Sequence, residues 1–220
     1  MKIRKRTADT ESSYRLRFPE DEQRHPWLPM LLDAYAIIDC GIALAVRREE
    51  KRRNSPLACR KGCDRCCHTH KDIPIYPLEM VGIYWFGIEK AAPPEREILI
   101  GRLLEYESGA CCPFLIEGAC AIHPVRPVSC RQFNVFNRPC GEGEDPYYTR
   151  RDDVLTPPRE YTERAFFVML PFYGITGRED RLRAVREGVI HSQVSNLKTC
   201  DWKSLGRRME SFDKGALYVA

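Results

Sequence analysis

The stretch 59-CRKGCDRCC-67 places four cysteines within nine residues, and 112-CPFLIEGACAIHPVRPVSC-130, followed by Cys140, supplies four more. Both stretches are interrupted by Gly or Pro and are poor in residues that could form a core of their own. Metal ligation is the usual way to order such segments, because the free energy of binding becomes free energy of folding. The sequence therefore predicts two irregular loops that are held together by metal.

The total number of cysteines also favours metal over disulfides. The sequence contains eleven, which cannot all pair: Cys40, Cys59, Cys63, Cys66, Cys67, Cys111, Cys112, Cys120, Cys130, Cys140 and Cys200. The basic start, MKIRKR, is followed by no apolar segment typical of a signal peptide. No stretch approaches the 18 apolar residues that a membrane span needs. We therefore expect a soluble cytosolic protein without membrane contact, where disulfides do not persist and clustered cysteines indicate metal.

The spacing within the first stretch predicts how the thiolates are used. Cys63 and Cys66 form a C-x2-C pair, which lets two thiolates converge on one ion, and Gly62 helps the backbone turn. Cys66 and Cys67 are consecutive, so we expect their side chains to point apart and to serve two metals, or two irons of one cluster. The second metal would then be completed by thiolates of the second stretch, which makes the sites shared.

The rest of the chain is typical of a mainly α-helical fold with minor β structure. In residues 27–53, apolar residues recur at steps of four and three along one helix face: Leu31, Tyr35, Ile38, Ile42 and Ala45. Further helices are predicted over 78–90, from Pro93 to about Tyr106, over 158–173 and over 178–190, with a short extended piece near 73–76. Residues 1–25 are interpreted as a polar arm and 26–220 as a single metal-binding domain. The last 20 residues are only weakly patterned.

The net charge of +4 gives no strong nucleic-acid signal, because acidic and basic residues are interspersed. The exception is the basic start with Lys2, Arg4, Lys5 and Arg6, interpreted as a solvated tail.

The cysteine pattern resembles a zinc- or iron-chelating family named for its cysteine run. Cys59-x3-Cys63-x2-Cys66-Cys67 matches that run, and CPFLIEGACAIHPVRPVSCRQF is similar to the family's second signature. The intervening IPIYPLEMVGIYW resembles its short strand, acidic residue (Glu79) and helix. The resemblance covers 59–140 and implies eight metal ligands: Cys59, Cys63, Cys66, Cys67, Cys112, Cys120, Cys130 and Cys140. Two departures are His123, where the family often has Tyr, and the extra thiol Cys111.

Several ligand assignments stay open at this stage. Cys111, His68, His70 or His123 could replace one of the eight cysteines, because zinc also takes imidazole. Arg126 and Arg131 flank Cys130, and we interpret them as compensating the negative charge of a thiolate site. Cys40 and Cys200 are interpreted as free thiols, Cys40 on the helix side away from the apolar stripe. His25 and His191 are interpreted as surface residues.

The pattern predicts a cytosolic metal-binding protein with zinc or iron ions, in two tetrathiolate sites or as one iron–sulfur cluster with further ligands. One branch of the family resembles flagellin lysine N-methylases, so the alternative is a methylase-like or redox protein-modifying enzyme with an iron–sulfur centre. A metal-delivery protein that meets a protein partner is the third hypothesis. The spacing Cys59-x3-Cys63-x2-Cys66 also occurs in radical S-adenosylmethionine enzymes, but the alternating strands and helices typical of those enzymes are missing.

Overall fold

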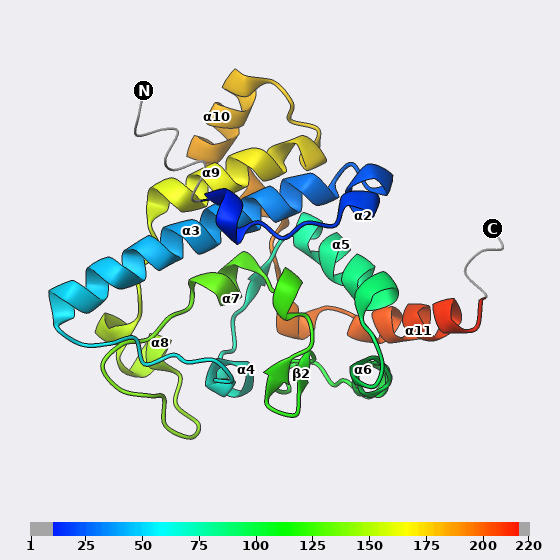
Figure 1. Cartoon of the computed structure of the whole chain (residues 1–220), viewed down its shortest axis with the longest axis horizontal. Coiled ribbons are helices and arrows are strands. Elements are labelled where there is room, and N and C mark those ends of the chain that lie inside the picture. Colours follow the sequence, from blue (N-terminus) through cyan, green and yellow to red (C-terminus); the bar gives the residue numbers. More distant parts are fainter. Residues whose placement is uncertain (1–10, 216–220) are drawn as a thin grey trace.

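The computed structural model describes residues 11–215, and the basic start at 2–6 lies outside the described residues. The described chain is mainly α-helical with a few very short strands, as predicted (Figure 1). Its α-helices are α2 (Pro19–Arg24), α3 (Leu28–Arg53), α4 (Arg65–Thr69), α5 (Pro77–Trp85), α6 (Glu95–Leu104), α7 (Val128–Gln132), α8 (Pro146–Thr149), α9 (Arg159–Met169), α10 (Arg178–Glu187) and α11 (Trp202–Asp213).

Short helical and extended pieces connect these helices. A π-helical turn, η1 (Phe86–Lys90), continues α5, and the 3-10 turns are η2 (His123–Val125), η3 (Arg151–Asp153), η4 (Leu170–Tyr173), η5 (Val189–Gln193) and η6 (Leu197–Thr199). Strands β1 (Pro74–Ile75) and β4 (Ser195–Asn196) pair antiparallel, with Pro74 opposite Asn196. Strands β2 (Leu115–Ile116) and β3 (Ala119–Cys120) form a hairpin, with Leu115 opposite Cys120.

The long helix α3 is the centre of the fold, and its predicted stripe is confirmed. Leu31, Tyr35 and Ile38 are buried. Along its length α3 packs against α9, and Figure 1 shows the two helices side by side. A side chain at Gly41 would collide with the Tyr161 ring of α9, so the close approach of the two helices requires glycine there.

The expectation about apolar length was wrong for α3. By length and composition this helix could cross a membrane. Eleven of its residues are buried against the rest of the chain, however, which is the position of a core helix.

A second group of helices, α5, α6 and α11, packs beside α3 and closes the core (Figure 1). The interpretation of the last 20 residues as weakly patterned was wrong. Trp202, Leu205 and Met209 are spaced at three and four residues and are all buried on one face of α11. Next to them, a Cβ at Gly206 would lie 3.1 Å from the Leu104 side chain, so α11 lies very close to α6.

Residues 11–25, which the sequence assigned to a polar arm, are attached to the domain by ion pairs. The Arg15 guanidinium binds Asp33 of α3 at 2.5 Å and Glu22 of α2 at 2.7 Å. The Asp21 carboxylate is only 4% exposed and binds Lys90 of η1 at 2.5 Å.

Candidate metal centre

Backbone hydrogen bonds bring the two cysteine stretches together. The Ala58 N–H donates to the Val135 carbonyl at 2.8 Å, and the Cys112 N–H donates to the Cys67 carbonyl at 2.8 Å. The first stretch is therefore joined at one end to the segment after α7 and at the other end to the segment before β2. Figure 1 shows α4, β2 and α7 gathered on one side of α3.

The eight predicted ligands occupy different elements around this junction. Cys66 and Cys67 lie in α4, Cys120 on β3 and Cys130 in α7. The remaining four lie in the connecting loops: Cys59, Cys63, Cys112 and Cys140. Cys112 is buried, Cys63 is exposed, and the other six are half-buried. All eleven cysteines of the chain lie in the described part, and none of them forms a disulfide there.

Electrostatic interactions between the thiols indicate two groups of four that meet at Cys66, which interacts with members of both. The Cys59 thiol interacts with Cys63, Cys66 and Cys140, and Cys140 in turn interacts with Cys63 and Cys66. These four are called the outer thiols: Cys59, Cys63, Cys66 and Cys140.

The other four cysteines form a second set. The Cys67 thiol interacts with Cys112 and Cys120, and Cys130 interacts with Cys120 and Cys67; Cys120 and Cys130 both interact with Cys66 as well. These are called the inner thiols: Cys67, Cys112, Cys120 and Cys130. Each group combines thiols from both stretches, so neither stretch forms a group alone.

The expectation that Cys66 and Cys67 point apart was too simple. Their thiols interact with each other although they are consecutive residues of the short helix α4. Their further neighbours nevertheless differ. Cys67 also interacts with Cys112, whereas Cys66 interacts with Cys59 and Cys140 of the outer group and with Cys120 and Cys130 of the inner group. Cys66 is therefore the thiol at the boundary between the two groups.

The sulfurs lie in surroundings where a thiolate is unfavourable unless a cation neutralises its charge. Burial raises the pKa of Cys59 to about 11 and raises the pKa of Cys130 well above its usual value. The hydrogen bond with Cys112 is the main cause that raises the pKa of Cys67 to about 12. The Val135 N–H opposes the shift at Cys59 by donating to its Sγ at 3.3 Å. A divalent cation would supply the positive charge that such buried thiols need to lose their protons.

The spacing of the sulfurs is wider than a single ion requires. Among the described residues, no three of these sulfurs lie within 4.8 Å of one another. Four thiolates around one zinc ion at about 2.3 Å stand about 3.8 Å apart. Cysteine sulfurs are chemically suited to bind zinc or iron. To bind one ion, four of these sulfurs would therefore have to move closer together than they are in this structure.

The two arginines beside Cys130 have different surroundings, which the sequence could not distinguish. The Arg131 guanidinium binds Asp39 at 2.5 Å, donates to the Pro124 and Arg126 carbonyls and lies 3.9 Å from the Tyr35 ring centre. Its hydrogen-bonding capacity is largely used within the fold.

Arg126 has no such set of partners. Its Nε is buried and, among the described residues, has no hydrogen-bond partner. Its positive charge lowers the pKa of Cys66, Cys120 and Cys130 against the effect of burial. Arg126 therefore matches the predicted role of charge compensation, whereas Arg131 chiefly supports the loop.

Glu79 positions the helix that carries Cys130. This fully buried carboxylate accepts the Val128 N–H at 2.7 Å and the Tyr76 N–H at 3.1 Å, which are at the starts of α7 and α5. Burial raises the pKa of Glu79 to about 7, and the two amide donors oppose that shift.

The family model agrees with this arrangement. Residues 58–154 match the model of the CxxCxxCC family, described as "Putative zinc- or iron-chelating domain". We call this matched segment the CxxCxxCC domain. It contains all eight predicted ligands, so the resemblance seen in the sequence is confirmed. No curated protein and no solved structure matched the chain.

The CxxCxxCC domain extends beyond the resemblance at 59–140. Its end at residue 154 coincides with an antiparallel bridge between Val154 and Val135. It occupies somewhat less than half of the chain, and the helices outside it, α3, α9, α10 and α11, supply much of the core that supports it.

Three of the four alternative ligands within the CxxCxxCC domain have other partners, and the fourth, His123, is exposed. His68 binds Asp64 at 3.1 Å, and His70 binds Asp145 at 3.0 Å. The Cys111 Sγ accepts a hydrogen bond from the Arg102 guanidinium at 2.8 Å.

The two cysteines outside the domain lie elsewhere. Cys200 donates to the Asn196 carbonyl at 3.2 Å. Cys40 is only 1% exposed and interacts with Tyr161 of α9. The helix side that carries Cys40, away from the predicted stripe, is therefore buried as well, because α9 covers it.

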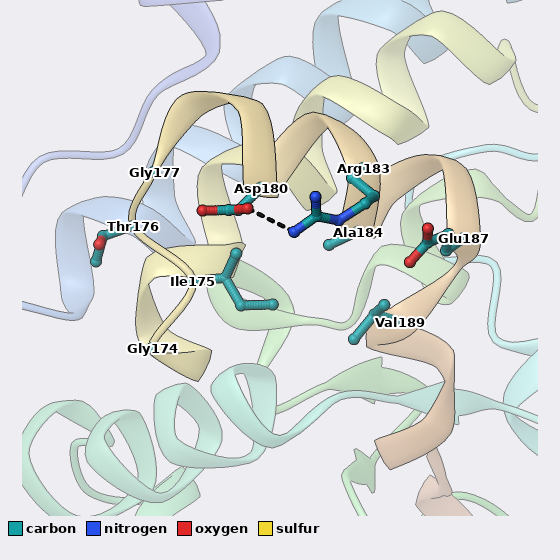
Figure 2. Close-up of a pocket in the computed structure, with 9 residues that line it drawn as sticks. All are labelled: Gly174, Ile175, Thr176, Gly177, Asp180, Arg183, Ala184, Glu187 and Val189. Carbon is teal, nitrogen blue, oxygen red and sulfur yellow. Dashed lines mark hydrogen bonds and ion pairs between the residues drawn. The ribbon is translucent and has the colours of Figure 1, made fainter.

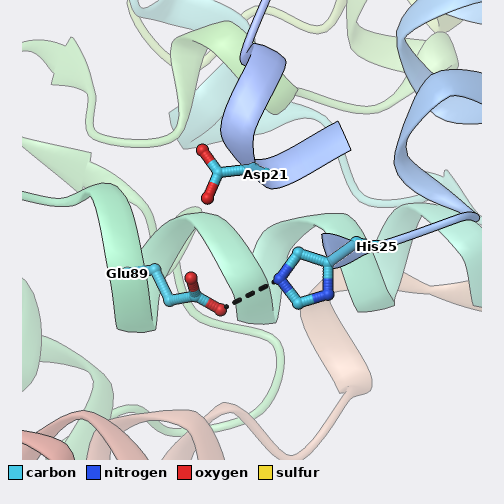
Figure 3. Close-up of side chains that lie close together, drawn as sticks. All are labelled: Asp21, His25 and Glu89. Carbon is cyan, nitrogen blue, oxygen red and sulfur yellow. Dashed lines mark ion pairs between the residues drawn. The ribbon is translucent and has the colours of Figure 1, made fainter. Parts of the chain in front are cut away.

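A third group of side chains was missed by the sequence analysis because its members are far apart in the chain. Ligand atoms of Asp21, His25 and Glu89 lie within 4.8 Å of one another (Figure 3). However, Asp21 already binds both Arg24 and Lys90, and Arg24 also binds Glu89. A metal ion would have to compete with two resident cations. We interpret the group as an ion-pair cluster that fastens α2 to η1, and His25 as half-buried within it.

Two surface cavities of about 360 Å³ each lie outside the thiol groups. One lies between the 174–177 loop and α10, where Asp180 and Arg183 bind each other at 2.6 Å (Figure 2). The other is lined by residues of α7, α8 and η3, including Phe133, Tyr147 and Arg151. Ser129, which lines this second cavity, precedes Cys130 in α7.

Proposed function

We propose that this chain binds two zinc or iron ions in its CxxCxxCC domain, one at the outer and one at the inner thiols. The outer site would use Cys59, Cys63, Cys66 and Cys140. The inner site would use Cys67, Cys112, Cys120 and Cys130. The observation that carries the proposal is the division of eight thiols into two groups of four, each with members from both stretches.

The metals would have a structural role. Each ion would connect loop segments more than 40 residues apart in the sequence, and such a cross-link restricts the unfolded chain strongly. A tetrathiolate site has no open coordination position, whereas catalytic zinc keeps one. The thiols remain available for metal only in a reducing compartment, so we propose a cytoplasmic location.

A second candidate is an enzyme that uses an iron–sulfur centre, of methylase-like or redox protein-modifying type. The observation that favours it is the wide spacing of the sulfurs, because a cluster of several irons is larger than one ion. The cavity with Phe133, Tyr147 and Arg151 beside α7 would offer a substrate site near such a cluster.

Elemental analysis of protein purified without oxygen tests both candidates. Two equivalents of colourless metal per chain would support the two-site proposal. Brown protein with iron and inorganic sulfide would support the iron–sulfur centre. Protein that lacks zinc and iron, and that takes up neither when it is supplied under reducing conditions, would refute both.

A further inference from the structure

The outer and inner thiols differ in how they are enclosed. Cys112 is part of the hydrophobic core, and Cys67, Cys120 and Cys130 pack against it. No outer thiol is among the described residues that form or contact this core. Cys63 is exposed, and it follows Gly62, whose φ of +81° marks a tight turn on the surface. A competing ligand can therefore reach the outer group directly at Cys63, whereas none of the four inner thiols is exposed.

The charges beside the two groups differ as well. A divalent ion with four thiolates carries two net negative charges, which must be offset when the site is enclosed. Arg126 supplies a positive charge to the inner thiols, and its buried Nε has no other described partner.

The outer group has no uncommitted cation of its own among its described neighbours, because Arg126 acts on a single outer thiol, Cys66, but on two inner thiols, Cys120 and Cys130. Arg150 is the cation that interacts with Cys140, but it already binds Glu144 at 2.9 Å and Asp153 at 2.9 Å. The Glu144 carboxylate also interacts with Cys140 and disfavours a further negative charge there. Charge therefore stabilises a loaded inner site more than a loaded outer site.

From the exposure and the charges, we infer that the outer site exchanges its metal with external chelating ligands, while the inner site retains its metal as a permanent part of the fold. This inference rests on the proposed two-site function. In the exchange, each metal–sulfur bond that breaks at the outer site is replaced by a bond to the incoming ligand, and the released thiolate takes a proton from water. The metal keeps its charge, so no oxidant or reductant is needed.

Metal release to a chromogenic chelator tests the inference. The full-length chain, reduced and loaded with zinc, is mixed with excess 4-(2-pyridylazo)resorcinol, and the absorbance of the zinc complex is followed with time. We expect one equivalent in a fast phase and one in a slow phase, with rates that differ by about tenfold or more, the range in which groups around a metal site alter affinity.

Three variants assign the phases. Cys63→Ser should abolish the fast phase and leave the slow one, and Cys140→Ser should do the same from the other stretch. Arg126→Gln should accelerate the slow phase about tenfold and leave the fast phase unchanged. Arg65→Gln is the matched control, because it removes the same charge from an exposed residue next to Cys66 and should change neither rate.

Two results would overturn the inference while the two-site function stands: release of both equivalents in one phase, or loss of the slow phase in Cys63→Ser with circular dichroism unchanged. Failure to bind two equivalents of zinc at all would refute the proposed function itself, and the inference with it.

Discussion

Replacing Arg131 by Met should lower the stability of the protein without making the inner site more labile. The Arg131 side chain is 6% exposed and binds Asp39 of α3, which is 27% exposed. It also donates to the Pro124 and Arg126 carbonyls, which lie in the segment between Cys120 and Cys130. Met has a similar length and fills the site beside the Tyr35 ring, so the substitution removes the charge and the hydrogen bonds with little change in volume.

The expected loss follows from these contacts. Removing one partner of a buried ion pair costs about 3–5 kcal/mol, mainly because the other charge is left without compensation. Asp39 is about a quarter exposed and can be rehydrated in part, which places the loss at the lower end, near 3 kcal/mol. The two lost carbonyl hydrogen bonds act in the same direction.

Urea unfolding of the zinc-loaded protein, followed by circular dichroism, measures this loss. Asp39→Asn is the matched control, because it removes the charge pair but leaves the carbonyl contacts of Arg131, and it should cost less than Arg131→Met. The interpretation would be refuted if Arg131→Met unfolded at the same urea concentration as the wild type. It would also be refuted if this variant kept its stability but released the slow zinc equivalent as fast as Arg126→Gln does.

The remaining predictions concern ligands, pH and folding. Cys200→Ser should retain full metal content, whereas Cys130→Ser should lose metal, and equal content by elemental analysis would contradict the ligand assignment. A peptide of residues 55–72 should bind less zinc per cysteine than the full chain, since each thiol group needs both stretches. The same amount of zinc per cysteine in a titration of the two would exclude shared sites. Chelator treatment should raise amide hydrogen exchange in residues 110–142, and unchanged protection would exclude a structural metal. The pKa of Glu79 is about 7 in the folded state and 4.5 in the unfolded chain, so the folded state favours the protonated carboxyl. Its contribution to the free energy of unfolding is therefore complete below pH 4.5 and falls by about 3 kcal/mol as the pH rises to 7. Urea unfolding between pH 5 and 7.5 should show this decline in the free energy of unfolding. Glu79→Gln should remove the contribution of Glu79 to the pH dependence, although the Gln amide has a single acceptor oxygen for the two N–H groups. An unchanged pH dependence in the variant would refute the raised pKa of Glu79.

Much of the architecture was readable from local sequence patterns. The helix over residues 27–53 was predictable because its apolar residues recur at the period of an α-helix over several turns, and the structure has α3 at Leu28–Arg53. The CxxCxxCC domain was recognisable because cysteine spacing is itself a local property. The α11 helix had the same kind of signal at Trp202, Leu205 and Met209, but over only two turns that also contain Gly206 and several charged residues.

The sequence alone therefore predicted the helical class, the resemblance to the family, whose model matches residues 58–154, and a set of eight candidate ligands, because these depend on residues close together in the chain. Tertiary structure decided how the thiols divide into two groups. That division depends on the hydrogen bonds that join Cys67 to Cys112 and Ala58 to Val135, across separations of more than 40 residues. It also decided that Arg131 is engaged by Asp39 while Arg126 faces the sulfurs, since the partners of a long side chain depend on which distant elements fold against it.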